Sequence, residues 1–148
     1  MWFNRYLLAN NNVFIIKWNR IMKELKNKTL TFLSGLEGYH QTLKLLHWSA
    51  THHALHVLTD DMDEEILKLE DEIAECVMGI LDTKFGIGEL KTLLPEAKTL
   101  DGVLKEMKKD LIEFKESVGD KPEVAGLQNI LDDYMQNINK WNYLRTFV

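Results

Sequence analysis

Apolar residues recur at intervals of three, four or seven in four separate segments, and the joins between these segments constrain the fold most. The segments cover residues 21–48, 52–81, 100–118 and 122–147. Such spacing places apolar side chains on one face of an α-helix, so it predicts four amphipathic helices. Two of the joins are short, which predicts two antiparallel helical hairpins. The third join, residues 82–99, is much longer.

The long join determines how the two hairpins are arranged. Gly86, Gly88 and Pro95 interrupt the helical pattern there, with one short helix predicted across residues 88–94. A segment of this length can run back along a bundle, so the second and third helices can be parallel. The predicted fold is therefore all-α, a four-helix bundle with one long crossover, which is the ferritin-like arrangement.

Each predicted helix has an apolar seam that should form the core of the bundle. Ser49-Ala50-Thr51 offers a break between the first two helices, with a Ser or Thr as the N-terminal cap. Gly119 and Pro122 separate the last two helices. The predicted core residues are Leu25, Phe32, Leu36, Tyr39, Leu43, Leu46, Leu55, Leu58, Met62, Ile66, Leu69, Ile73, Cys76, Ile80, Leu100, Leu104, Met107, Leu111, Phe114, Val118, Leu127, Leu131, Tyr134, Ile138, Trp141 and Leu144.

Length and composition indicate one ordinary globular domain. The chain has 148 residues, of which 45% are hydrophobic and 28% charged. The net charge of −5 argues against general attraction to nucleic acid. The single cysteine, Cys76, excludes an internal disulfide and fits a reducing compartment, so we expect a cytoplasmic protein.

The first twenty residues are apolar but are interrupted by polar positions. Arg5, Asn10–Asn12 and Lys17 break the run, which never approaches the ~20 apolar residues of a membrane span. We therefore expect residues 1–20 to be an arm or a helical extension that packs on a neighbour, with the bundle domain at residues 21–148. No association with a membrane is expected.

Residues 47–75 hold five potential metal ligands at spacings that core packing does not require. They are His47, His56, Asp60, Asp71 and Glu75. Within the second helix they form two pairs with a spacing of four, so each pair projects from one helix face. The two aspartates are eleven positions apart, about three turns, so all four side chains share one stripe. Imidazole with carboxylate is a ligand mixture that suits iron, manganese or zinc.

A single copy of this helix cannot bring both pairs to one metal ion. Asp60 and Asp71 lie roughly 16 Å apart along the axis, whereas metal–ligand bonds are about 2 Å long. Two antiparallel copies related by a two-fold axis near residues 65–66 would place His56 opposite the partner's Glu75, and Asp60 opposite the partner's Asp71. An isologous interface of this kind creates two equivalent sites per dimer. The short join after His47 folds that residue back, so the two imidazoles can converge.

Other polar residues near this segment are expected to have structural roles. His52 and His53 should start the second helix, and Glu64 should be a surface acid or support a ligand. Glu37-x-x-His40 is similar to the Glu-x-x-His of bundle diiron proteins, but those need two copies. We therefore expect His40 at the edge of the core. Trp48, Trp141 and Tyr134 are expected in the core or an interface. No Gly-rich phosphate loop, nucleophile triad or Cys-based zinc pattern is present.

The segment LHWSATHHALHVLTDDMDEEILKLEDEIAE resembles the ferroxidase segment of Dps-type miniferritins. That family has a His-Trp pair at the end of the first helix, then His-x-x-x-Asp, then Asp-x-x-x-Glu eleven residues after the first Asp. This chain matches with His47-Trp48, His56…Asp60 and Asp71…Glu75. The C-terminal INKWNYLRTFV is similar to the closing helix of the same family, and the resemblance covers roughly residues 25–148.

The resemblance implies a diiron-type oxidation site at a two-fold dimer interface. The two histidines and the first aspartate would come from one subunit, and Asp71 and Glu75 from the other. It further implies a hollow homo-oligomer, usually of twelve subunits, that oxidises Fe(II) with hydrogen peroxide and stores ferric mineral. Zinc or manganese could substitute for iron. Consumption of both reactants would protect DNA.

Two departures from the family pattern are clear. The turn between His47 and His56 is about three residues shorter than the common pattern, and the N-terminal arm is apolar instead of Lys-rich, so DNA binding through the arm is not expected. A solvated face of an acidic helix is the simplest alternative interpretation of the carboxylates, but it does not explain His47 at the turn. The alternative function is a non-catalytic oligomerisation module with a vestigial or zinc-occupied site.

Overall fold

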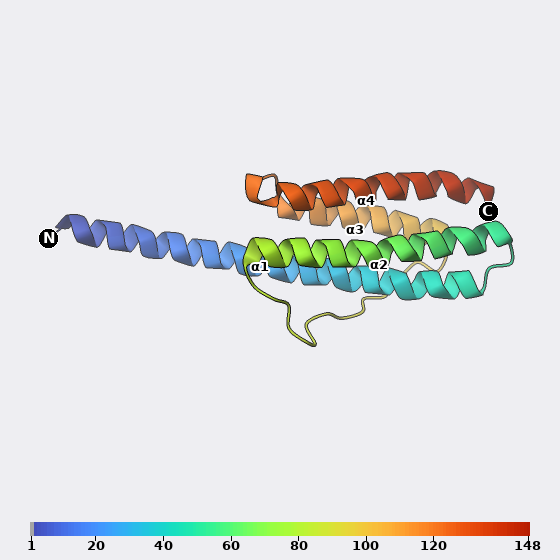
Figure 1. Ribbon diagram of the computed structural model, residues 1–148, viewed down its shortest axis with the longest axis horizontal. Helices are drawn as coiled ribbons and strands as arrows, with labels where there is room; N and C mark the ends of the chain where they lie inside the picture. Colours follow the sequence, from blue (N-terminus) through green and yellow to red (C-terminus); the bar gives the residue numbers. More distant parts are fainter. Residues whose placement is uncertain (1) are drawn as a thin grey trace.

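The computed structural model describes residues 2–148, and the side chains of Val13 and of residues 15–148. It contains four α-helices, α1 (Trp2–Trp48), α2 (His53–Leu81), α3 (Leu100–Val118) and α4 (Ala125–Leu144). Two 3₁₀ turns, η1 (Pro122–Val124) and η2 (Arg145–Phe147), flank α4. The helices lie side by side (Figure 1), and the described residues contain no strand. The expected all-α fold with four main helices is confirmed.

The apolar seams meet between the four helices and form a single core. Leu36, Leu43, Ile66, Leu111 and Ile138 are among the side chains that are fully buried. Most other predicted core residues are buried as well, and several others, such as Leu25 and Leu144, are partly buried. Val77 takes the buried position that the sequence assigned to Cys76, which packs at the edge of the core. The core fixes α1 and α2 side by side, and this arrangement positions the candidate site.

The first helix is longer than the bundle. The structure joins residues 2–20 to the first predicted helix without a break, so this segment is a helical extension. Figure 1 shows it projecting beyond the ends of the other helices. The apolar side chains described there are exposed, including Val13, Ile15, Ile16 and Trp18. No helix among the described residues combines the length and apolarity needed to cross a membrane.

The turn between α1 and α2 is short, but it is capped differently from the prediction. The N-cap of α2 is His52, and its side chain makes no capping hydrogen bond. The prediction of a Ser or Thr cap was wrong. The Ser49 hydroxyl donates to the carbonyl oxygen of Leu45 in α1 over 2.8 Å, so it does not cap α2. The start of α2 therefore depends on its packing against α1.

The connection of residues 82–99 contains no helix, so the short helix predicted across residues 88–94 is wrong. The backbone N–H of Leu93 donates to the carbonyl of Ser34 (2.8 Å), and that of Lys91 donates to the Ser34 hydroxyl (3.0 Å). These donors are therefore not available for helical bonds within the connection. Gly88 adds a turn with φ +85°, a conformation that a helix cannot contain.

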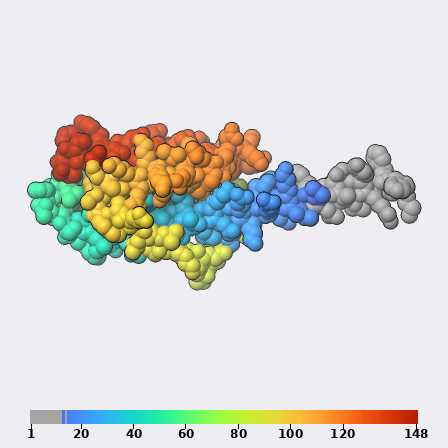
Figure 2. All heavy atoms as spheres, turned by 180° about the vertical axis from the view of Figure 1, so that it is seen from behind, coloured from blue at the N-terminus to red at the C-terminus, as the bar shows by residue number. Residues whose placement is uncertain are grey.

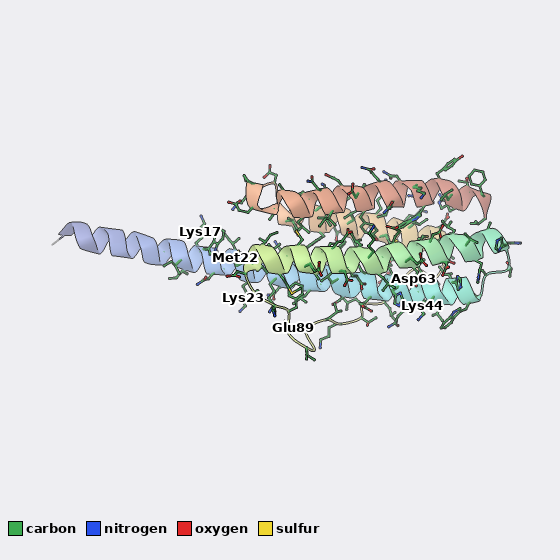
Figure 3. The ribbon with its side chains drawn as sticks, viewed as in Figure 1. Lys17, Met22, Lys23, Lys44, Asp63 and Glu89 are labelled. Carbon is green, nitrogen blue, oxygen red and sulfur yellow. The ribbon has the colours of Figure 1, made fainter. Side chains whose placement is uncertain are left out.

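Small residues on α1 let the connection approach closely. A Cβ atom at Gly38 would lie only 1.8 Å from the carbonyl oxygen of Leu93. Nearer the start of the connection, Lys26 Nζ forms an ion pair with Glu89 Oε1 at 2.9 Å. Figure 3 shows Glu89 on this connection beside the first part of the bundle. The connection thus follows α1 along one face of the molecule.

Candidate metal centre

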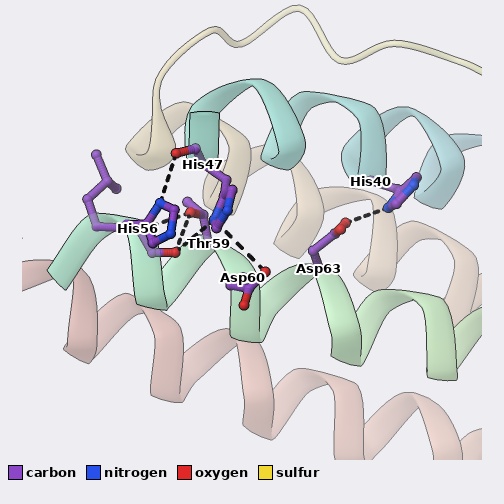
Figure 4. Close-up of polar contacts among 7 residues, drawn as sticks. His40, His47, His56, Thr59, Asp60 and Asp63 are labelled. Carbon is purple, nitrogen blue, oxygen red and sulfur yellow. Dashed lines mark hydrogen bonds and ion pairs between the residues drawn. The ribbon is translucent and has the colours of Figure 1, made fainter. Parts of the chain in front are cut away.

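The α1–α2 hairpin brings two histidines into direct contact. His47 lies in the last turn of α1, and His56 lies in the first turn of α2. Their rings stack with centroids 3.7 Å apart and an interplanar angle of 26°. Figure 4 shows the two rings facing each other across the turn. The predicted convergence of these imidazoles is confirmed.

Main-chain carbonyls fix which nitrogen of each ring carries the proton. His47 Nδ1 lies 3.0 Å from the carbonyl oxygen of His56, and His56 Nδ1 lies 3.2 Å from the carbonyl oxygen of His47. A carbonyl oxygen can only accept, so each Nδ1–H must donate. In the neutral ring this leaves the lone pair on Nε2. A histidine that donates one ring N–H to a carbonyl is oriented to offer the other nitrogen to a metal.

Asp60 is the third predicted ligand that lies near these rings. Its Oδ1 is 3.9 Å from His47 Nδ1, and its side chain is 62% exposed (Figure 4). The carboxylate is held loosely, because no shorter contact restrains it among the described residues. Asp60 therefore sits at the rim of the histidine pair and can turn toward a cation or toward a second chain.

Asp71 and Glu75 are exposed on α2 and do not join the histidine pair. They lie on the same helix, and Asp71 is roughly 16 Å along the axis from Asp60. Within one chain, no three His, Cys, Asp or Glu side chains of those described are arranged to hold a metal ion. One copy of the chain thus holds the predicted ligands as two separate half-sets.

The face of α2 that carries these carboxylates is not covered by any of the described side chains. Asp60, Glu64, Asp71 and Glu75 are all exposed along one stripe. The same stripe includes Leu67, an apolar side chain that is 42% exposed near the centre of the helix. We call these five residues, with Val57, the α2 outer face. An apolar residue near the middle of a polar stripe is compatible with contact to another molecule.

A second group of polar residues lies deeper between α1 and α2. His40 Nδ1 and Asp63 Oδ1 are 2.5 Å apart (Figure 4). Two turns further along α2, the half-buried carboxyl of Glu70 lies near that of Glu37 on α1, and its Oε1 is buried without a hydrogen-bond partner among the described residues. Burial, and then the charge of Glu37, raise the pKa of Glu70 to about 8. His40 and Asp63 therefore pair with each other, whereas Glu70 faces a like charge at Glu37.

The sequence did not indicate these cross-helix pairs, although a signal was present. The centre of the turn lies midway between His47 and His56. In an antiparallel hairpin, a residue a given number of positions before this centre lies opposite the residue the same number of positions after it. That rule places His40 opposite Asp63, and it places Glu37 within one turn of Glu70. The expected position of His40 at the edge of the core agrees with its partial burial.

The remaining residues of interest mostly occupy the expected positions. His52 and His53 begin α2, and Glu64 is exposed. Tyr134 and Trp141 are buried and meet edge to face at 6.1 Å. Trp48 is not in the core of the chain: it is 70% exposed, with Lys44 Nζ 5.6 Å from its ring centroid. The core position predicted for Trp48 is therefore wrong, and a position in an interface with another chain stays a prediction.

Comparison with known proteins identifies no relative. No family model, curated protein or solved structure matches the chain.

Proposed function

We propose that the protein is a miniferritin-like ferroxidase. In this proposal the chain forms a ferritin-like bundle with one long crossover, and copies of it form a homo-oligomer that oxidises Fe(II) and stores or detoxifies the product. The observation that carries the proposal is the His47–His56 pair. Both rings are oriented by carbonyls through Nδ1, and neither Nε2 has a hydrogen-bond partner among the described residues.

The complete site would be shared between two chains. His47, His56 and Asp60 would come from one copy, and Asp71 and Glu75 from its partner. Support comes from the separation of the two half-sets along α2 and from the exposure of the whole α2 outer face. A two-fold axis near residues 65–66 would bring the half-sets together twice per dimer. Twelve subunits would be the expected assembly from the resemblance.

Each ligand would have a distinct role toward iron, which is the substrate. Asp60 and Glu75 would hold and bridge iron, and the histidines would add neutral nitrogen donors. Asp71 would bind a second iron or orient a histidine. Clustered carboxylates favour the higher charge of Fe(III), so they lower the cost of oxidation. Two Fe(II) ions would each give one electron to hydrogen peroxide, whose O–O bond breaks and which takes up two protons to form two water molecules.

Anaerobic loading with Fe(II), followed by a pulse of peroxide, tests this proposal. The wild-type protein should develop ferric absorbance rapidly, and Asp60→Ala or Glu75→Ala should slow the initial rate by at least about a hundredfold. Asp61→Ala is a matched control, because Asp61 is exposed beside Asp60 but points about 100° away around the helix. Equal rates in Asp60→Ala and Asp61→Ala would remove the proposed site.

A structural module that binds zinc without redox chemistry is the second candidate. The exposed apolar residues of the α1 extension, such as Ile16 and Trp18, favour an additional packing partner. Two histidines with carboxylates also suit zinc. This candidate predicts metal binding that depends on His47 and His56, together with ferric absorbance that grows no faster than in buffer alone.

A further inference from the structure

A groove opens between α1 and α3 on the face that the connection crosses. We call it the α1–α3 groove: Gly35 and Tyr39 line it from α1, Asp110 and Phe114 from α3, and residues 93–96 from the connection. Its volume is about 530 Å³, within the range of small-molecule sites. Figure 2 views the molecule from the side on which α3, α1 and the connection are seen together. The groove is distinct from the candidate metal centre on α2.

The fold itself keeps this groove open. The connection is fixed on α1 by the bonds to Ser34 and by its close approach at Gly38, so residues 93–96 pass beside the helices without filling the space between them. At Gly35 the groove is wider still, because a Cβ atom there would meet nothing within 4 Å. A bulky side chain at Gly35 would therefore project into the empty space.

The floor of the groove is aromatic. Phe32 of α1 and Phe114 of α3 stack with ring centroids 4.4 Å apart and an interplanar angle of 9°. Leu93, Leu94 and Pro95 add apolar surface from the connection. Such a floor favours a flat, apolar group of about the size of an aromatic ring.

The charge around the groove is negative. Glu96, Glu106, Asp110 and Glu113 line it, against a single lysine, Lys28. Lys28 forms an ion pair at 2.6 Å with Glu24, a residue that lies outside the groove lining. Glu113 is paired at 3.9 Å with Lys109, which lies outside the lining, whereas Glu96, Glu106 and Asp110 form no ion pair among the described residues.

Asp110 is the carboxylate best placed to anchor a cation. The Tyr39 hydroxyl donates to Asp110 Oδ2 over 2.6 Å, which orients the carboxylate and leaves Oδ1 available. Burial and this hydrogen bond raise the pKa of Tyr39, so the hydroxyl stays a donor. Glu106, by contrast, accepts backbone N–H bonds from Glu96 and Ala97, at 3.1 and 2.6 Å, through its two oxygens. A half-buried carboxylate without a countercharge favours a cationic ligand.

We propose that the α1–α3 groove binds a small organic cation, a protonated amine joined to an aromatic body. The ring would lie on the Phe32–Phe114 floor, and the ammonium group would meet Asp110. This inference does not depend on iron chemistry, because none of the residues involved belongs to the candidate metal centre.

Titration of the full chain with tryptamine, followed by amide chemical shifts, tests the proposal. Tryptophol, which replaces the amine with a hydroxyl, is the matched neutral probe. Tryptamine should bind saturably and at least about tenfold more tightly than tryptophol, because only the amine gains a charge-assisted bond. Asp110→Asn should remove this preference, whereas Glu116→Gln, an exposed α3 position outside the groove lining, should preserve it.

Gly35→Leu provides a test that does not alter charge. Leucine is a good helix former, so the variant should fold, but its side chain should fill the groove and abolish tryptamine binding. Circular dichroism of each variant checks that it has kept its helical fold. Equal affinity for the two probes, absence of saturable binding, or tryptamine binding that survives Gly35→Leu would each overturn the proposal. A change in oligomer size caused by Gly35→Leu, with no tryptamine binding to the wild-type protein, would also overturn the proposal. It would show that a second copy of the chain occupies the groove.

Discussion

At the scale of single residues, two glycines of α1 differ in what a methyl group would meet. Gly35 faces open space, and Gly38 faces the carbonyl oxygen of Leu93. Alanine is favoured over glycine inside a helix by about 1 kcal/mol. Gly35→Ala should therefore raise the free energy of unfolding by about that amount. Gly38→Ala should lower it by roughly 1–3 kcal/mol, because the connection must move away from α1.

Urea denaturation of both variants measures this difference, and Gly79→Ala is a further control. Gly79 lies in α2, and a methyl group there would also have no neighbour within 4 Å, so this position should behave like Gly35. A Gly38→Ala protein as stable as the other two would mean that the connection does not follow α1 at Leu93.

Glu70 should make the stability of the metal-free protein depend on pH. Its pKa is raised from 4.5 to about 8, chiefly by burial and then by the charge of Glu37, with smaller effects of Asp71 and Asp63. The folded state therefore holds a proton that the unfolded state releases above pH 4.5. The resulting stabilisation is complete below that pH and is lost as the pH rises through about 8.

Glu70→Gln isolates this effect, because an amide keeps the shape of the carboxyl without titrating. We expect wild-type stability to fall by on the order of 1 kcal/mol more than that of Glu70→Gln between pH 5 and 9, given partial screening by water. Urea midpoints across this range measure the loss. Parallel pH profiles for the two proteins would show that Glu70 is ionised throughout.

Several residue-level features were accessible from the sequence because they depend on spacing alone. The contact between His47 and His56 follows from a short turn, and it was predicted. The Glu37–Glu70 pair was not predicted, because it depends on the register between two helices and on burial that spacing does not reveal. The exposure of Trp48 also depends on where the bundle ends, so the sequence left its position open.

At the scale of elements, α2 presents an outer face that the proposal assigns to a second copy. Leu67 lies near the proposed axis and is 42% exposed. Leu67→Arg would place two like charges close to that axis, so it should weaken the dimer and slow iron oxidation by at least about tenfold. Sedimentation velocity and the peroxide assay measure the two effects.

Ile112→Arg is the matched control for this change. Ile112 is 40% exposed on α3, away from the α2 outer face, so the same substitution there should preserve both association and activity. A Leu67→Arg protein that remains associated and active would place the interface elsewhere.

The helices themselves were predictable because their apolar seams repeat with helical spacing. The range 100–118 agrees with α3, and the predicted second helix differs from α2 by one residue at its start. The connection was less predictable. Its backbone N–H groups bond to Ser34, a residue more than fifty positions away, and local sequence cannot reveal such a contact.

At the scale of the whole molecule, the proposed function requires two chains to complete one site. A single chain holds His47, His56 and Asp60 at one end of α2, and it holds Asp71 and Glu75 about three turns away. Helical rise made this separation predictable. The proposed assembly and the role of the α1 extension would depend on surfaces of several chains, which local spacing does not encode.

Complementation between two inactive variants tests the shared site most directly. His56→Ala damages one half-set and Glu75→Ala damages the other, so each protein alone should be inactive. When the two are unfolded together and refolded, half of the dimers should be mixed, and each mixed dimer should contain one intact site. We therefore expect recovery of about a quarter of the wild-type oxidation rate. A mixture that stays as inactive as its components would contradict a site built from two chains.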